Sequence, residues 1–247
     1  MDIALLTDAA VPARPAARRA ASIARAMQGS LRQVARAPGP VRSWIDACTG
    51  ADLIVSGDHD DGWCDALVGS SAERIARLAQ RPVLLVRQAP RGPYRKALVP
   101  VDFSPWSEAA VALARRIVPQ ADLVLMHALE LPGVGKMRYA GVGQDLIARY
   151  REAAERQAHD RLRALAPAAG PTWVHTVVTA DAAPWQLIVR TAEDEGCDLV
   201  VIGKRGRHAL DELLLGSTTR RVVTESRIDI LLSTSGPGVH PLDTIGS

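Results

Sequence analysis

Short runs of apolar residues recur along the chain, and amphipathic stretches separate them. One run covers residues 199–202 and a later run covers residues 228–232. Each run has the length of a buried strand and is bounded by glycine or polar residues. The stretch between them first carries glycines and then shows apolar positions three or four residues apart, which is typical of a helix. The pattern therefore predicts a strand, a loop, a helix and a second strand.

The same alternation fills the second half of the chain. The predicted strands cover residues 97–102, 122–129, 173–179, 199–202 and 228–232. The predicted helices cover residues 106–118, 144–165 and 182–195, and a further helix starts near Ser217. Residues 130–143 are rich in glycine and predict a loop, while Ser104 and Pro105 predict a helix cap and first turn. Strands that alternate with helices predict an α/β fold with an open parallel sheet, helices on both faces and right-handed crossovers.

The first half repeats this pattern in a shorter form. Strands are predicted over residues 3–8, 31–35 and 82–86, and helices over residues 16–27 and 41–48. Residues 51–87 and 197–233 share one order of acidic residue, apolar strand, glycine, loop, Gly-Ser pair, helix and apolar strand. The matched positions are Asp52 with Asp198, Gly57 with Gly203, and Gly69-Ser70 with Gly216-Ser217. Because the copies are about 146 residues apart, too far for a solenoid repeat, they predict two copies of one domain.

This repeat sets the expected domain boundaries. Residues 88–95 contain Pro90, Gly92 and Pro93 and predict a linker between the halves. We expect a shortened first domain over residues 1–90, which lacks one helix–strand unit, a complete second domain over residues 91–235, and a flexible tail over residues 236–247. The last strand of each half would be an exposed apolar edge if it were unpaired. We therefore expect these two strands to be covered or paired.

Three glycines with a fixed spacing follow the strand at residues 199–202. Gly203 ends the strand, Gly206 lies in the loop, and Gly216 with Ser217 opens the next helix. This spacing differs from the GxxxxGK[ST] phosphate loop and from the GxGxxG dinucleotide fingerprint. A glycine at a strand end allows close approach to the backbone, and a helix N-terminus favours an anion such as phosphate. A tight turn with a Gly-Ser helix cap and no ligand is the alternative from these residues alone.

The stretch resembles the nucleotide-binding signature of the universal stress protein family, in its ATP-binding branch. Gly203, Gly206, Gly216 and Ser217 carry the resemblance, which extends over residues 96–233 and more loosely over the first half. It implies two tandem flavodoxin-like domains of the adenine nucleotide alpha hydrolase-like fold, with ATP, alone or with Mg²⁺, as the bound cofactor. It also implies a role in a stress response or as a nucleotide-dependent regulator, and an antiparallel pairing of each terminal strand with a second domain. We therefore expect the two halves to pair with each other as a pseudo-dimer, or two chains to form a homodimer. A slow ATP hydrolase and a ligand-free dimerisation scaffold are the alternatives.

The resemblance also assigns binding residues. Adenine and ribose would be held by Pro100, Val101, Asp102 and Ala128. The phosphates would be held by Gly203, Arg205, Gly206, Gly216, Ser217, Thr218 and Thr219. An ionised Asp102 only accepts hydrogen bonds, so it suits a hydroxyl or amine and not a phosphate. Positive charge is expected from Lys204, Arg205 and Arg207. No catalytic residue and no metal site are assigned.

Some of these residues have a structural alternative. Asp102 could cap the helix that follows it. His127 lies within an apolar strand and is more typical of a packed core histidine than of a ligand. Arg205 and Arg207 could form a solvated loop surface.

The first half departs from the pattern in the loop that would face the phosphates. This loop carries Asp58, Asp60 and Asp61, with Asp60 in the place of Gly206. Because carboxylates repel a polyphosphate, we expect one ATP per chain, held by the second half. A metal site in this Asp/His cluster is a weaker alternative, since adjacent positions on one loop rarely all face inward.

Composition narrows the functional classes further. Apolar residues make up 47% of the 247 residues, which suffices for a sizeable core. The net charge is +3 and no basic run is interleaved with aromatics, so nucleic acid is not an expected partner. Cys48, Cys64 and Cys197 form no CxxC pair, which favours reduced thiols. The sequence has no 18-residue apolar stretch and no signal-peptide pattern, so we expect a cytoplasmic protein without membrane contact.

Overall fold

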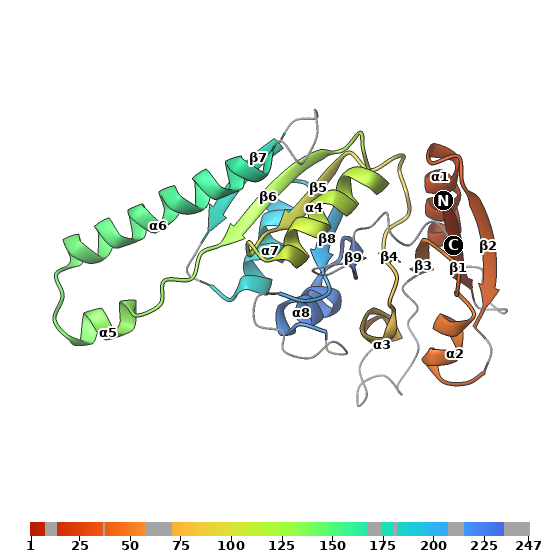
Figure 1. The fold of residues 1–247 in the computed structure, drawn as a ribbon, viewed down its shortest axis with the longest axis horizontal. Coiled ribbons are helices and arrows are strands. Elements are labelled where there is room, and N and C mark those ends of the chain that lie inside the picture. Colours follow the sequence, from red (N-terminus) through yellow and green to blue (C-terminus); the bar gives the residue numbers. More distant parts are fainter. Residues whose placement is uncertain are drawn as a thin grey trace.

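A computed structural model of the chain describes residues 1–7, 14–36, 38–57, 71–166, 174–179, 182–206 and 215–234. Within these residues one nine-stranded sheet runs through the molecule, with helices on both of its faces (Figure 1). The prediction of an α/β fold with a largely parallel sheet is confirmed. The predicted tail, the acidic loop of the first half and Arg207 lie outside the described residues.

The elements of the first half follow the predicted order. They are β1 (Asp2–Thr7), α1 (Arg14–Ala26), β2 (Ser30–Ala35), α2 (Val41–Asp46), β3 (Leu53–Gly57), α3 (Ser71–Leu78) and β4 (Val83–Val86). Their ends differ from the predicted ranges by less than one helical turn. Within the described residues, this half has one strand fewer than the second half, in keeping with the shorter pattern of its sequence.

The second half contains a complete alternation of strands and helices. Its elements are β5 (Lys96–Pro100), α4 (Pro105–Ile117), β6 (Asp122–Ala128), α5 (Val134–Tyr139), α6 (Gln144–Leu165), β7 (Val174–Thr179), α7 (Pro184–Asp194), β8 (Leu199–Gly203), α8 (Ser217–Glu225) and β9 (Asp229–Ser233). The predicted cap of α4 is confirmed, since the Ser104 hydroxyl accepts a hydrogen bond from the Ser107 N–H and Pro105 occupies the first turn. The expectation of a loop throughout residues 130–143 is wrong, because α5 lies within it.

The glycines that suggested a loop are the caps of α5. Gly133 precedes the helix at φ 86° and Gly141 follows it at φ 73°, two left-handed conformations that favour glycine. The N–H of Val142 donates to Met137 O and that of Gly141 to Arg138 O, which is the hydrogen-bond pattern of a Schellman C-cap. Together with the start of α6, this short helix lies beyond the edge of the sheet (Figure 1).

The strand order is β2-β1-β3-β4-β9-β8-β5-β6-β7. Neighbouring strands run parallel except at the centre, where β4 pairs antiparallel with β9 in the register Val83 to Leu232 and Leu85 to Ile230. The last strands of the two halves therefore pair with each other, as predicted. This pairing joins the halves into one continuous sheet and leaves neither strand as an apolar edge.

Alternate residues of each strand point to opposite faces, so the sheet has two apolar layers. In β8, Leu199 and Val201 belong to the apolar layer of one face, which includes buried residues of α1, α4 and α6. Val200 and Ile202 belong to the layer of the other face, which includes buried residues of α2, α3, α7 and α8. Every described helix except α5 thus covers a buried sheet face, and the carboxyl ends of β5, β6 and β8 stay open between the two helical layers.

The predicted linker at residues 88–95 is anchored to the centre of the sheet by a buried carboxylate. Asp229 in β9 is 1% exposed, and its Oδ1 accepts hydrogen bonds from the backbone N–H groups of Arg87 (2.7 Å) and Gln88 (3.0 Å). Its Oδ2 accepts from the Tyr94 hydroxyl (2.6 Å) and lies 3.6 Å from Arg19 Nε of α1. A single side chain of the second half therefore fixes both ends of the linker and a helix of the first half.

Candidate functional site

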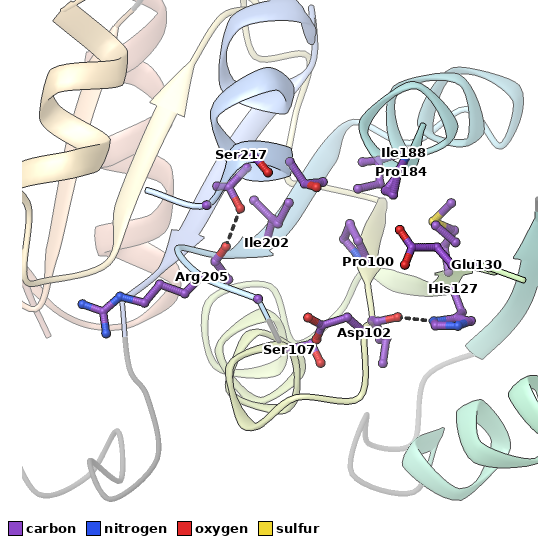
Figure 2. A pocket seen from close by; sticks show the side chains of 18 residues that line it. Pro100, Asp102, Ser107, His127, Glu130, Pro184, Ile188, Ile202, Arg205 and Ser217 are labelled. Carbon is purple, nitrogen blue, oxygen red and sulfur yellow. Dashed lines mark hydrogen bonds between the residues drawn. The ribbon is translucent and has the colours of Figure 1, made fainter. Parts of the chain in front are cut away.

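A cavity of about 310 Å³ opens at the carboxyl ends of β5, β6 and β8 (Figure 2). All the residues assigned to nucleotide from the sequence line it: Pro100, Val101, Asp102, Ala128, Gly203, Arg205, Gly206, Gly216, Ser217, Thr218 and Thr219. Sequence order reverses between β5 and β8, so the cavity lies at the topological switch point where ligands of open α/β sheets bind. The structure thus brings every assigned residue to one place.

Other lining residues were not identified from the sequence. They are Ser107, Met126, Glu130, Pro184, Ile188 and Ile202, while His127, which the sequence places at this strand end without a binding role, also lines the cavity. The first turn of α7 supplies Pro184 and Ile188, whose side chains lie on the same side of the cavity (Figure 2). The position of α7 after a predicted strand could have indicated this wall, but the apolar residues carry no motif of their own.

The turn after β5 is held in place by a set of hydrogen bonds. The N–H of Val101 donates to Met126 O (2.7 Å), and Val101 O accepts from His127 Nδ1 (2.7 Å). Asp102 Oδ1 accepts from the N–H of Ser104 (3.0 Å) and from its hydroxyl (2.5 Å). Since Ser104 caps α4, Asp102 supports that cap indirectly while it also lines the cavity. The alternative that Asp102 itself caps α4 is therefore wrong, because Ser104 is the N-cap and Asp102 binds that residue.

Phe103, the residue between Asp102 and Ser104, has a left-handed backbone conformation at φ 60°. Such a conformation is unfavourable for a bulky side chain by about 1–3 kcal/mol and persists where the surroundings fix it. Here the ring centroid of Phe103 lies 4.6 Å from that of His127. The guanidinium carbon of Arg161 lies 3.8 Å from the same Phe103 centroid. His127 thus packs as expected of a core histidine, and it also forms part of the cavity wall.

Two of the three signature glycines are required by close contacts within the protein. A Cβ on Gly203 would lie 3.0 Å from Arg205 O and 3.1 Å from Trp106 O. A Cβ on Gly206 would lie 2.8 Å from Asp102 Oδ2. A Cβ on Gly216 would meet nothing nearer than 3.6 Å. Gly203 therefore allows close approach of the protein's own backbone, whereas the sequence predicts close approach of a ligand.

The N-terminus of α8 faces the cavity with Ser217, Thr218 and Thr219 in its first turn. The first N–H groups of a helix have no partner within it and carry its positive dipole end, so they favour an anion. The Thr219 hydroxyl donates to Gly203 O (2.9 Å), which ties α8 to the end of β8. The Thr219 hydroxyl is thus engaged with the strand end.

The basic side chains of the turn after β8 point away from the cavity. Lys204 is 6% exposed, and its Nζ donates to Ala79 O of the first half (2.8 Å), so the expectation that it supplies charge to the cavity is wrong. Arg205 lines the cavity through its backbone, while its side chain turns outward (Figure 2) and its guanidinium carbon lies 4.6 Å from the centroid of Trp106.

Burial, and secondarily the charge of Arg205, lower the pKa of Lys204 from 10.5 to about 8. A charged amine in this position is therefore disfavoured relative to water. Among the described lining residues, the ionisable side chains that do not turn away are Asp102, His127 and Glu130. The cavity consequently combines an acidic wall near β5 and β6 with a helix N-terminus on the opposite side.

Cysteines, metal ligands and membrane-spanning helices add no further candidate site within the described part of the chain. Cys48 and Cys197 are buried and free, and burial raises the pKa of both thiols. In the ranges that the structure describes, no group of three or more His, Cys, Asp or Glu side chains is placed to hold a metal ion. None of the described helices has the length and apolar character needed to cross a membrane.

Comparisons with known proteins agree on one family. The profile of the Universal stress protein family matches residues 93–233. A universal stress protein of Mycobacterium tuberculosis is 28% identical over 210 residues, a match that covers 78% of this chain and 65% of the relative. A universal stress protein A homolog of Coxiella burnetii is 31% identical over 142 residues, which is 56% of this chain and 93% of the relative. The chain thus spans 65% of the length of the mycobacterial relative.

A solved structure shows the same fold over nearly the whole chain. The crystal structure of a universal stress protein from Archaeoglobus fulgidus matches with a TM-score of 0.62 and 16% sequence identity. The match covers 96% of this chain and 97% of that chain. It therefore includes both halves of the nine-stranded sheet.

Proposed function

The chain belongs to the universal stress protein family, and from that premise we propose that it binds ATP in the cavity of its second half. The bound state would act as the signal of a nucleotide-dependent regulator in a stress response. The chain would be a tandem form, with residues 1–90 as a shortened, non-binding domain and residues 91–235 as the binding domain.

The observation that carries this proposal is the convergence of the assigned residues. They were chosen from a spacing pattern and a resemblance, and they come from segments up to about a hundred residues apart in sequence. In the structure they line one cavity, whose volume of about 310 Å³ falls in the range of small-molecule sites.

The chemistry of the wall fits the parts of a nucleotide. Pro100, Met126 and Ile188 offer apolar contact for a base. Asp102 can accept hydrogen bonds from ribose hydroxyls, and the first N–H groups of α8 can donate to phosphate. Because Lys204 and Arg205 turn away, the phosphate charge would be balanced by these N–H groups and by any cation that accompanies the nucleotide.

Binding without fast turnover follows from the same wall. Asp102 already accepts two hydrogen bonds from Ser104, and the resemblance assigns it to the nucleoside and not to the phosphates. A general base must reach the attacking water within hydrogen-bond distance. The function therefore rests on nucleotide occupancy and not on product formation.

The test replaces Ser217, the first residue of α8, with aspartate. An acidic residue in the first turn stabilises a helix, so Ser217→Asp keeps the fold, but it places a negative charge where phosphate would bind. We expect calorimetric titration to show ATP affinity at least tenfold weaker and adenosine affinity unchanged. Gln144→Asp is the matched control, because Gln144 is also the first residue of a helix that follows a glycine. No ATP binding by the wild-type chain, with or without Mg²⁺, would refute the proposal.

A further inference from the structure

Lys204 lies between two residues of the cavity wall but extends into the first half of the chain. It follows Gly203 directly and precedes Arg205, and its side chain is 6% exposed. The amine donates a 2.8 Å hydrogen bond to the carbonyl of Ala79, the residue after α3. A lysine at the carboxyl end of a helix meets partly negative carbonyl groups. The turn after β8, which lines the cavity, is therefore attached to the end of α3 in the first half.

The backbone of Lys204 fixes the other elements around the cavity. Its N–H donates to Ser233 O at the end of β9 (2.7 Å), and its carbonyl accepts from the N–H of Gly216 at the start of α8 (3.0 Å). A displacement of this residue would therefore shift Gly203, Gly216 and the end of β9 together. Each of the two glycines lines the cavity.

Other contacts follow the same seam between the halves but are weaker. The Thr234 hydroxyl donates to Gln80 O (3.1 Å) at an exposed position. Arg220 of α8 lies 3.9 Å from Glu73 of α3, and the arginine side chain is 56% exposed. Exposed pairs of this kind contribute little to stability. The buried hydrogen bond of Lys204 is thus the strongest of these side-chain attachments between α3 and the cavity.

The attachment is unfavourable for folding in its charged form. Burial lowers the pKa of Lys204 to about 8, and the neighbouring Arg205 acts in the same direction. The charged residues on α3, on α8 and in the turn beside Lys204 are Glu73, Arg74, Arg77, Arg205, Arg220, Arg221 and Glu225. A methionine would fill similar space without a buried charge. A costly side chain placed between two cavity residues points to a role in the shape of the cavity.

We propose that Lys204 is a positioning residue that couples occupancy of the cavity to the docking of α3 from the first half. This inference rests on the proposed nucleotide site. Its tether to Ala79 holds the turn from Gly203 to Gly206 in the shape that brings Gly206 against Asp102 and Gly216 against the turn. By thermodynamic reciprocity, a nucleotide that favours this shape also stabilises the end of α3. The first half would then respond to nucleotide without binding it.

Amide hydrogen exchange on the full chain tests this coupling. In the wild-type protein, saturating ATP is expected to slow exchange of the amides of α3 and of Ala79 directly after it. The N–H of Ala79 donates to Ile75 O. In Lys204→Met the α3 protection should disappear and ATP affinity should fall by about tenfold, within the usual range of coupling effects. Arg220→Met is the matched control, because it removes only the exposed ion pair to α3 and should leave both quantities unchanged.

If the role of Lys204 were purely structural, Lys204→Met would weaken α3 both with and without nucleotide. The amide exchange of α3 would then not depend on ATP. Wild-type ATP binding without α3 protection would overturn the coupling and leave the proposed function intact. The coupling is equally overturned if Lys204→Met binds ATP as tightly as wild type. Absence of ATP binding by the wild-type chain would instead refute the proposed function, and this inference with it.

Discussion

Gly206 and Asp102 lie so close that a Cβ on the glycine would stand 2.8 Å from Asp102 Oδ2. The carboxylate cannot easily move away, because its other oxygen accepts hydrogen bonds from the N–H and hydroxyl of Ser104. The turns after β5 and β8 therefore meet at a point that has room for glycine alone. This contact joins the two segments assigned to opposite ends of the nucleotide.

We expect Gly206→Ala to destabilise the fold by about 1–3 kcal/mol, the range for overpacking. Gly206→Asp should be worse and should abolish ATP binding, because it adds a second carboxylate beside Asp102. Urea unfolding of both variants gives the stability change. Gly143→Ala is the control, since its Cβ would lie in open space. The contact with Asp102 is the cause only if Asp102→Ala removes most of the Gly206→Ala cost; equal cost in both backgrounds would contradict it.

The buried Asp229 is expected to dominate the stability of the junction between the halves. Burial, and then the charge of Asp229, raise the pKa of Tyr94 well above its ordinary value, so the tyrosine remains a donor to the carboxylate. Asp229→Ala leaves Arg19 and two backbone N–H groups without this acceptor. We expect a loss of about 3–5 kcal/mol in chemical unfolding.

Tyr94→Phe provides the graded comparison at the same site. It removes one hydrogen bond and keeps the ring against Arg19, whose guanidinium carbon lies 3.7 Å from the ring centroid. Its cost should be about 1–2 kcal/mol. If Asp229→Ala costs no more than Tyr94→Phe, the carboxylate does not anchor the linker to the sheet.

The cavity could be located from the sequence because its signature acts through the backbone. Gly203 and Gly216 mark the end of β8 and the start of α8, and both boundaries follow from local patterns of apolar residues. Parallel strands bring their carboxyl ends to one edge, so Asp102 and Ala128 had to lie near these glycines. Backbone position at this level follows from short-range sequence and topology.

The directions of long side chains could not be predicted in the same way. The partner of Lys204 is Ala79, 125 residues earlier in the chain, and no local pattern identifies it. The outward direction of the Arg205 side chain goes with its contact to the ring of Trp106 in α4. The glycine content of residues 130–143 predicts a loop, whereas Gly133 and Gly141 cap the two ends of α5. Local sequence indicated where these residues are, and tertiary contacts decided where their side chains point.

The titration of Lys204 should be visible in the pH dependence of stability. Its pKa is about 8 in the folded chain and about 10.5 when exposed, so the folded protein releases this proton at lower pH than the unfolded chain. Below pH 8 the burial of the charged amine lowers stability, and this cost disappears as the pH rises from 8 towards 10.5. A shift of this size corresponds to about 3 kcal/mol.

Lys204→Met isolates this contribution. The stability difference between Lys204→Met and the wild type should change by about 2.5 kcal/mol between pH 7 and pH 10, with the wild type gaining relative to the variant. Urea unfolding at several pH values measures it. A difference that stays constant over this range would mean that the amine is not buried as a charged group at neutral pH.

The last prediction concerns how many nucleotides one chain binds. In the second half the cavity spans the ends of β6, β5 and β8. In the first half the equivalent strands are β2, β1 and β3, and there Arg36 follows β2 directly. Its guanidinium donates to the Ser56 hydroxyl (2.6 Å) and to Gly57 O (3.4 Å) of β3. Because β1 lies between these two strands, the 9%-exposed side chain of Arg36 crosses the end of β1, where a nucleotide would have to lie.

We therefore expect one ATP per chain. The first half has its crevice closed by Arg36, and its loop carries Asp58, Asp60 and Asp61, whose charges repel phosphate. Calorimetric titration of the wild-type chain should give a single equivalent, and Ser217→Asp should weaken that one event at least tenfold and leave no second, tighter one. Arg36→Ala opens the crevice but keeps the acidic loop, so it should still bind one equivalent. Two equivalents in the wild type would show that Arg36 moves aside and that both halves bind nucleotide.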